Sequence, residues 1–225
     1  MSIHQVLVDD TNPGIQYSGP WFIAQNTRLN TGTNGPPFQN TLHGVNVNAS
    51  FSYSFSGMTR WLVYFIHLSL ILGHFSGSQV IVLGTSMTKA ASRTPTQDPT
   101  WECFVDNISI GWGFSAGAGS ENNWVFCQSD LHDGPHVLSI NVTVLDVQTF
   151  WFDQIQYIPS SNVPLDSSTV RVDSSDPAIL YSSGSNPIEG GLPLYGPQWK
   201  ELDSIVNFTQ VAGSTVTYQF FGSYQ

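Results

Sequence analysis

The 225-residue chain carries 6 Lys and Arg against 16 Asp and Glu, so its net charge is −10 at neutral pH. A surface this acidic repels phosphate backbones and anionic headgroups, which argues against nucleic acid as a partner. Only 10% of the residues are charged, and uncharged polar residues take their place, as in many secreted proteins. The first residues lack the basic start and apolar stretch of a signal peptide. Composition is therefore the only basis on which we infer an extracellular or cell-surface location.

Short apolar or alternating runs, separated by Asn-Pro, Asp-Pro and Asp-Gly-Pro turns, follow one another along the chain. Runs of this length and period predict strands rather than helices. We expect strands over 5–8, 51–55, 80–83, 103–110, 124–127, 136–144 and 150–158. Many short strands with such turns predict an all-β fold, a jelly-roll β-sandwich of the galactose-binding-like type.

An internal repeat divides the chain. The residues of 8–18 return in 172–182, with Val, Asp, Pro, Ile, Tyr and Ser at identical spacing, and 47–57 is echoed by 211–222 with one extra residue. We therefore predict a sandwich over 1–158, a linker over 159–168 and the front half of a second copy over 169–225. A half sandwich cannot bury both faces, so we expect the second copy to be loosely packed or to lean on the first.

The segment 58–77 interrupts the pattern. Its 61–75 stretch is the most apolar in the chain but is shorter than the roughly 20 residues that span a bilayer. Removing 58–77 joins two strand-like runs through a short turn. We interpret this segment as an insertion foreign to the fold, such as a retained intron; a short membrane-spanning or interfacial helix and a buried helix are the alternatives.

The two cysteines, Cys103 and Cys127, match no zinc pattern. If 101–106 and 123–127 are antiparallel neighbours, a disulfide places the turn near Ser115, in a Gly-rich stretch. Such a bridge is worth roughly 3 kcal/mol in an oxidising compartment. Two buried free thiols are the alternative.

Tryptophan is the main candidate for ligand contact, because sugars stack on exposed aromatic rings beside amide and carboxylate side chains. We place Trp21 and Trp112 in loops and propose them as ligand-binding residues with Asn122 and Asn123. Trp in β proteins more often fills the core. We expect the strand residues Trp101, Trp124 and Trp151 to be core residues.

Three acidic residues form a candidate calcium site. Asp9 and Asp10 close the first predicted strand and Asp153 lies in the last, and hard carboxylate oxygens are the ligands that Ca²⁺ prefers. Asp173 and Asp176 are the counterparts in the second copy. The alternative is a turn in which the Asp side chains accept hydrogen bonds from backbone N–H groups.

Several motifs resemble an uncharacterised family of surface proteins from mushroom-forming fungi, and the resemblance covers nearly the whole chain. The motifs lie at 8–21, 40–44, 101–107, 122–127, 133–138 and 150–157. The resemblance implies tandem galactose-binding-like jelly rolls, often followed by a transmembrane helix, and it implies no catalytic residue. The 58–77 segment and the incomplete second domain depart from the family pattern.

Four Asn-x-Ser/Thr sequons predict N-glycosylation at Asn48, Asn107, Asn141 and Asn207. We therefore expect a non-catalytic surface glycoprotein that binds glycan or cell-wall polysaccharide, by fold analogy. A structural or adhesive ectodomain without a small ligand is the alternative. A glycoside hydrolase is less favoured, because no spacing announces a pair of catalytic carboxylates.

Overall fold

The structure is a computed structural model, and it describes residues 4–25, 33–57, 78–88, 98–115, 119–145, 148–182, 199–202, 206–209 and 213–219. The segment 58–77, which we predicted to be an insertion, lies outside these residues. The chain divides into two compact units, Val6–Val163 and a second made of Met1–Gln5 with Pro164–Gln225. Among the described residues no helix is long and apolar enough to cross a bilayer.

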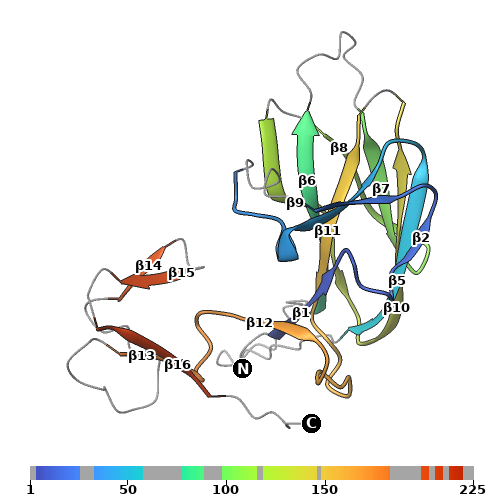
Figure 1. Cartoon of the computed structure of the whole chain (residues 1–225). Helices are drawn as coiled ribbons and strands as arrows, with labels where there is room; N and C mark the ends of the chain where they lie inside the picture. Colours follow the sequence, from blue (N-terminus) through green and yellow to red (C-terminus); the bar gives the residue numbers. More distant parts are fainter. Residues whose placement is uncertain are drawn as a thin grey trace, which may run out of the picture. The chain divides into compact units, whose positions relative to one another are not determined.

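The first unit is a β-sandwich, so the predicted all-β jelly-roll class is confirmed. In one sheet, β11 (Phe150–Tyr157) pairs with β1 (His4–Asp9), β4 (Thr41–Val45) and β6 (Ser78–Thr88); β3 (Phe22–Gln25) follows β4, and β9 (Gly119–Leu131) follows β6. The other sheet has the order β2 (Gln16–Ser18), β5 (Ala49–Gly57), β10 (Gly134–Thr143), β7 (Thr100–Val105) and β8 (Ile108–Phe114). Figure 1 shows the two layers.

Alternation along the strands builds the core between the layers. In β10 the buried residues are His136, Leu138, Ile140 and Val142, and the residues between them face outward. Aromatic rings fill the centre: Phe51 of β5 lies 4.3 Å from Phe152 of β11 between ring centroids. The strand β11 is buried along almost its whole length because it pairs on both edges.

The predicted strand 103–110 is two strands. A tight turn at Asp106 and Asn107, with φ angles of 52° and 66°, joins β7 to β8. Positive φ at both central residues defines a hairpin turn that usually carries Asn-Gly or Asp-Gly. Because the chain has Asp-Asn here, the alternating pattern ran through the turn without a visible break.

The disulfide between Cys103 and Cys127 is present, but the geometry expected for it was wrong. Cys103 lies in β7 and Cys127 in β9, which belong to different sheets. β7 pairs with β8 and β10, not with β9. The bridge therefore ties the two layers of the sandwich together instead of closing a hairpin.

The second unit contains β12 (Thr169–Val172), the pair β13 (Ile179–Ser182) with β16 (Thr215–Tyr218), and the pair β14 (Trp199–Leu202) with β15 (Val206–Thr209). These pairs repeat the register of the first unit. Gln16 pairs with Ser52, and Leu180 pairs with Thr217. The predicted alignment with one extra residue places the same positions together.

Hydrogen bonds at the opening turn are also matched between the units. The hydroxyl of Tyr17 donates to the Asp10 carbonyl at 2.6 Å, and that of Tyr181 donates to the Ser174 carbonyl at 2.8 Å. Three further bonds are matched. The Thr11 N–H donates to Asp9 as the Ser175 N–H donates to Asp173. The other two matched pairs are Gly14 N to Asn12 with Ala178 N to Asp176, and Trp21 Nε1 to Ser18 with Trp199 Nε1 to Ser182. The two opening turns therefore share the same set of hydrogen bonds, and the tandem repeat itself stays a prediction.

The segment predicted as a linker begins against the sandwich. Pro159 and Ser160 are buried. The Ser160 hydroxyl lies 2.7 Å from the Gly57 carbonyl and 2.6 Å from a carboxylate oxygen of Asp133. The division between the units falls after Val163, inside the predicted linker.

Candidate functional site

Trp112 lies on the outer face of the five-stranded sheet, in strand β8 rather than in the loop that we expected. Its neighbours Gly111 and Gly113 face inward: a Cβ at Gly113 would lie 2.7 Å from the ring of Trp101. Because side chains alternate along a strand, inward glycines place Trp112 on the solvent side. The residue is 67% exposed.

Aromatic and polar side chains surround Trp112. Phe114 lies 6.2 Å away between ring centroids, with 29° between the ring planes. Glu102 is the cross-strand partner of Trp112 and accepts a 2.7 Å hydrogen bond from the Ser109 hydroxyl. Asn141 of β10 pairs with Glu102 from the other side and is exposed. We call these five residues, Glu102, Ser109, Trp112, Phe114 and Asn141, the Trp112 face.

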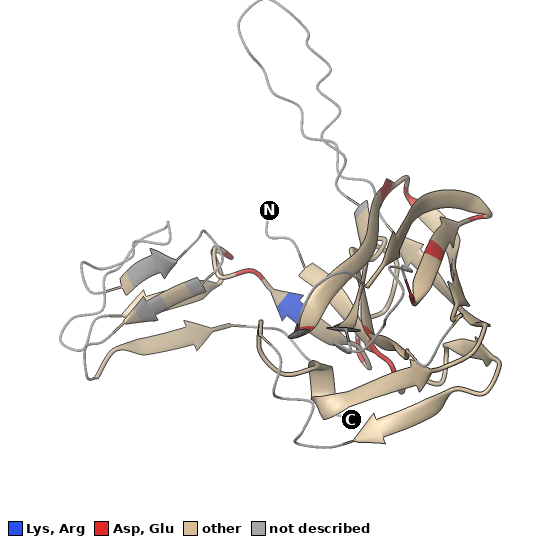
Figure 2. Ribbon diagram, turned by 90° about the horizontal axis from the view of Figure 1, so that it is seen from above, with Lys and Arg blue, Asp and Glu red and all other residues tan. Residues whose placement is uncertain are grey.

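Basic side chains are missing from the described part of the sandwich. The six Lys and Arg are Arg28, Arg60, Lys89, Arg93, Arg171 and Lys200. The first four lie outside the described residues and the last two belong to the second unit. Figure 2 marks several acidic positions on the strands in red and a basic position in blue. Glu102 is the charged residue of the Trp112 face, and its carboxylate disfavours an anionic ligand there.

The other three predicted ligand residues serve the fold. Trp21 is half-buried; its indole Nε1 lies 3.1 Å from the carbonyls of Ser18 and Ser50. Asn122 is fully buried and donates to the Gly35 carbonyl at 2.8 Å. Asn123 donates to the Asn34 carbonyl at 2.8 Å. The two asparagines hold the loop at 34–36, and the structure does not bring them to the Trp112 face.

The three tryptophans that we expected in the core differ in their exposure. Trp101 is buried and its Nε1 donates to the Phe126 carbonyl at 3.1 Å. Trp151 is half-buried, with its ring edge-on to Phe22 at 5.4 Å. Trp124, expected in the core, is 40% exposed. A bulge where β9 pairs with β6 precedes it, so the alternation on which the expectation rested is broken there.

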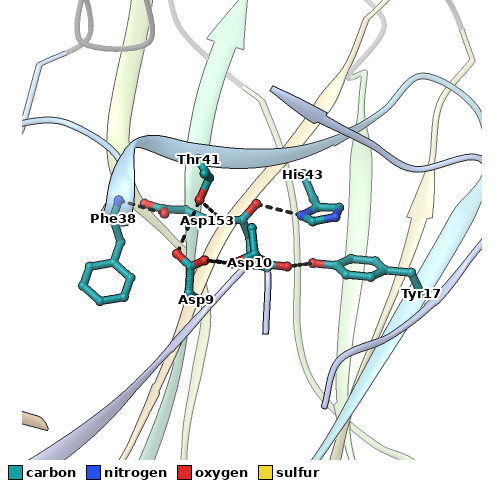
Figure 3. A network of polar contacts seen from close by, with 8 residues as sticks. Asp9, Asp10, Tyr17, Phe38, Thr41, His43 and Asp153 are labelled. Atoms are coloured by element: carbon teal, nitrogen blue, oxygen red, sulfur yellow. Dashed lines mark hydrogen bonds and ion pairs between the residues drawn. The ribbon is translucent and has the colours of Figure 1, made fainter. Parts of the chain in front are cut away.

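The three predicted calcium ligands do come close together, at one end of the pairing between β1 and β11 (Figure 3). Asp9 and Asp10 end β1, where the pairing stops at Asp9 opposite Gln154. Asp153 is the residue before Gln154. It lies where the strand paired with β11 changes from β1 to β4 and where the register between β11 and β6 shifts. A strand irregularity of this kind turns a polar side chain into the core.

Hydrogen-bond donors surround these carboxylates (Figure 3). Asp10 contacts the Thr41 hydroxyl at 2.5 Å with one oxygen and His43 Nδ1 at 2.7 Å with the other. Asp9 accepts from the backbone and side chain of Thr11. Asp153 Oδ1 accepts from the Phe38 N–H at 2.9 Å, while its Oδ2 is buried without a hydrogen-bond partner.

Electrostatics favour a proton on Asp153. Burial raises its pKa to about 8; the Phe38 hydrogen bond opposes this rise, and the charges of Asp10 and Asp9 add to it. Burial also raises the pKa of Asp9. Three carboxylates close together in the core cannot all be charged at low cost unless a cation or a proton compensates them.

The fit to calcium is partial. The orphan oxygen of Asp153 and the acidic surroundings suit a hard cation. Against this, Thr41 and His43 engage both oxygens of Asp10. No group of three or more His, Cys, Asp or Glu has a metal-holding arrangement in the described part of the chain. His43 and Thr41 were missed as members of this network, although both lie in the 40–44 motif.

The predicted glycosylation sites differ in their surroundings. Asn48, Asn107 and Asn141 are exposed. Asn207, in the second unit, donates a 3.4 Å hydrogen bond to the Ser174 carbonyl, and its Oδ1 is buried without a partner. Asn141 is both a sequon residue and part of the Trp112 face, so a glycan attached there would cover that face.

No family model matches the chain. No curated protein matches it either, so the resemblance to fungal surface proteins stays a prediction. Solved structures do match at low identity. The CBM36-1 domain of a multidomain xylanase from the hindgut metagenome of Trinervitermes trinervoides is 10% identical, with a TM-score of 0.38, over 70% of this chain and 98% of that domain.

Two enzymes match over smaller shares of their own length. A family two carbohydrate esterase from Cellvibrio japonicus is 13% identical over 73% of this chain and 37% of the esterase, with a TM-score of 0.36. The catalytic domain of a GH87 alpha-1,3-glucanase in complex with tetrasaccharides is 11% identical over 72% of this chain and 30% of that domain, with a TM-score of 0.38. The structural neighbours of this β-sandwich thus include a carbohydrate-binding module and carbohydrate-active enzymes.

Proposed function

We propose that the chain is a non-catalytic surface module that binds a neutral polysaccharide through the Trp112 face. The observation that carries the proposal is the exposed ring of Trp112 on a rigid sheet, beside Phe114 and between polar side chains. An exposed aromatic ring held in place by a sheet offers apolar area at little entropic cost. Sugar rings present C–H faces to such a ring and hydroxyls to its polar neighbours.

The polar residues of the face give it chemical selectivity. Glu102 is an acceptor for sugar hydroxyls, and the Asn141 amide both donates and accepts. With Glu102 as the charged group of the face, the site favours uncharged chains over uronic acid or sulfated chains. Ser109 orients the Glu102 carboxylate through its 2.7 Å hydrogen bond.

Affinity electrophoresis tests the proposal, with xylan, alpha-1,3-glucan and beta-1,3-glucan as neutral probes and polygalacturonate as the anionic one. We expect a neutral chain to retard the protein and Trp112→Ala to weaken that binding about tenfold, since a central aromatic contributes at least 1–2 kcal/mol. Trp124→Ala is the matched control, because it removes another exposed Trp from the other sheet.

Absence of binding to every neutral polysaccharide would reject the proposal and favour the adhesive ectodomain. Equal effects of the two Trp variants would also reject the Trp112 face. The protein should be made without N-glycans, because a glycan on Asn141 would cover the site. In a glycosylating host, Thr143→Ala, which removes the sequon and keeps Asn141, should then restore binding.

We also propose that Asp9, Asp10 and Asp153 hold a structural Ca²⁺ when calcium is abundant. The support is the buried, unpartnered Asp153 Oδ2 among three carboxylates. The ion would replace the proton on Asp153 and offset two of the three negative charges of the cluster. It would stabilise the junction of β1, β4 and β11 and take no part in ligand contact.

A further inference from the structure

A buried histidine ties together two turns of the sandwich. His136 lies near the start of β10, and its side chain is 7% exposed. Its Nδ1 lies 2.7 Å from Asp106 Oδ2, in the turn between β7 and β8. Its Nε2 lies 2.9 Å from the backbone carbonyl of His132, between β9 and β10. Each ring nitrogen of His136 therefore faces an oxygen.

Both of these oxygens are hydrogen-bond acceptors. The His132 carbonyl has no hydrogen to donate, and an ionised Asp106 carboxylate only accepts. A neutral imidazole has one N–H and one lone pair, so it satisfies one of the two contacts and turns a lone pair toward the other oxygen. The geometry therefore requires a proton on each nitrogen of His136 as long as Asp106 is charged.

The surroundings of Asp106 keep its carboxylate charged. Its side chain is 47% exposed, and its Oδ1 accepts the Val137 N–H at 2.9 Å. The hydrogen bonds from His136 and from the Val137 N–H lower the pKa of Asp106. The Asp106 N–H donates in return to the Val137 carbonyl at 3.0 Å. Three bonds thus hold the turn to β10, and the one from His136 depends on the proton of the ring.

Several elements face His136. The carboxylates of Asp106 and Asp133 act on it from the two turns, the His132 ring lies 6.5 Å away, and the Phe55 ring of β5 lies 5.7 Å away between centroids. Burial opposes the charge on His136, but the hydrogen bonds to Asp106 and to the His132 carbonyl outweigh it and raise its pKa. The stability that this proton provides is therefore complete below the unfolded-state pKa of about 6.5 and is lost as the pH rises through the folded-state pKa.

We propose that His136 is a pH-sensitive pin of the β7–β8 hairpin, which holds the Trp112 face in place when the ring is protonated and loosens it when the proton is lost. The strand β8 lies at the edge of its sheet and pairs with β7. It carries Trp112 and also Ser109, whose hydroxyl orients Glu102 of the face. Loosening the turn therefore affects all three. The pin needs no ligand, but its effect on binding rests on the proposed function.

The substitution Asp106→Asn separates the pin from the shape of the turn. Residue 106 has a φ of 52°, which asparagine adopts readily. The new amide oxygen can accept the Val137 N–H, and the amide NH₂ can donate to Nδ1 of a neutral His136. We expect this variant to keep the hairpin and to lose its pH dependence. His132→Gln is the matched control, because it removes the neighbouring imidazole and leaves the carbonyl that His136 contacts.

Hydrogen exchange of the full chain, made without N-glycans, measures the pin in the absence of ligand. Between pH 5.5 and pH 8.5 the protection factors of 105–114 should fall about fivefold in the wild type and in His132→Gln, because a charge-assisted hydrogen bond is lost. They should stay level in Asp106→Asn. Asp153 is present in all three proteins, so the difference between the profiles isolates His136. The Cε1 resonance of His136 should titrate above about pH 6.5.

Affinity electrophoresis with a neutral polysaccharide then tests the effect on the Trp112 face. Affinity should fall by a similar factor over the same pH range in the wild type and not in Asp106→Asn. Level protection of the hairpin in the wild type, or an equal fall in Asp106→Asn, would overturn the pin. Lost protection with unchanged affinity would overturn its control of the face. If no polysaccharide binds at either pH, the proposed function fails, while the exchange data still decide the pin.

Discussion

Asp9 and Asp173 have the same local structure and opposite electrostatics. Each accepts hydrogen bonds from the backbone and hydroxyl of the residue two positions on, Thr11 or Ser175. Hydrogen bonds from Ser175 lower the pKa of Asp173, whereas burial raises the pKa of Asp9 despite the equivalent bonds. The turn is thus a local property of the sequence, and the environment is set by what packs on it.

The packing partner that differs is β11. In the sandwich it buries the turn, Tyr17 and Phe51, and it brings Asp153 to the carboxylates. In the second unit the equivalent side chains line an open hollow. Residues at equivalent positions therefore line a core in one unit and an open hollow in the other.

The largest expected effect comes from truncating the side chain at each of two equivalent positions, Phe51 and Val216, and comparing the losses of stability. Phe51→Ala should lower the free energy of unfolding of the sandwich by about 3–5 kcal/mol, because it leaves a cavity against Phe152. Val216→Ala should cost about 0.5 kcal/mol or less, because Val216 is half-exposed. Chemical denaturation followed by tryptophan fluorescence measures both. A similar cost at the two positions would contradict the view that β11 makes the difference.

The fold class was predictable because it depends on short-range patterns. Alternation and turn residues located the strands around 51–55, 136–144 and 150–158. What failed was pairing: the Asp106-Asn107 turn went unseen, and Cys103 and Cys127 were assigned to neighbouring strands of one sheet. A disulfide shows that two strands are close, but it does not say whether they share a sheet.

The candidate sites were predictable to different degrees. Asp9, Asp10 and Asp153 could be grouped because the first and last strands of such sandwiches pair. Trp112 was predicted to contact ligand, but its position in a strand and its neighbours Glu102 and Phe114 were not predicted. The missed signal was the alternation itself: with Trp101 and Cys103 facing inward, Glu102 has to face outward.

A smaller effect should come from the proton on Asp153. Its pKa is about 8 in the folded chain, so the folded state binds the proton more tightly than the unfolded state does. The stability that this proton provides is complete below about pH 4 and is lost as the pH rises to about 8, at up to about 1.4 kcal/mol per pH unit.

Asp153→Asn should remove that dependence. In EGTA, the difference in unfolding free energy between Asp153→Asn and the wild type should grow by on the order of 3 kcal/mol between pH 5 and pH 8. Asp173→Asn is the control, because the lowered pKa of Asp173 keeps its carboxylate charged throughout this range. Parallel pH profiles for the wild type and Asp153→Asn would show that Asp153 stays ionised.

Calcium should produce the smallest of these effects and the sharpest distinction between the two units. The sandwich has three carboxylates around the orphan oxygen of Asp153, whereas the second unit has Ser174 in the place of Asp10. An ion at a hundred times its dissociation constant stabilises the state it binds by about 2.7 kcal/mol, which raises the melting temperature of a domain of this size by roughly 5–10 °C.

Differential scanning calorimetry at pH 7.5 checks this expectation, with calcium compared against EGTA and with magnesium as the control ion. Calcium should raise the sandwich transition in the wild type and in Asp173→Asn, but not in Asp153→Asn. Bound calcium should also flatten the pH dependence, because the ion displaces the proton from Asp153. Equal melting temperatures in calcium and EGTA would mean that Thr41, His43 and the retained proton balance the carboxylates without a metal. The acidic cluster would then be a proton-compensated part of the core.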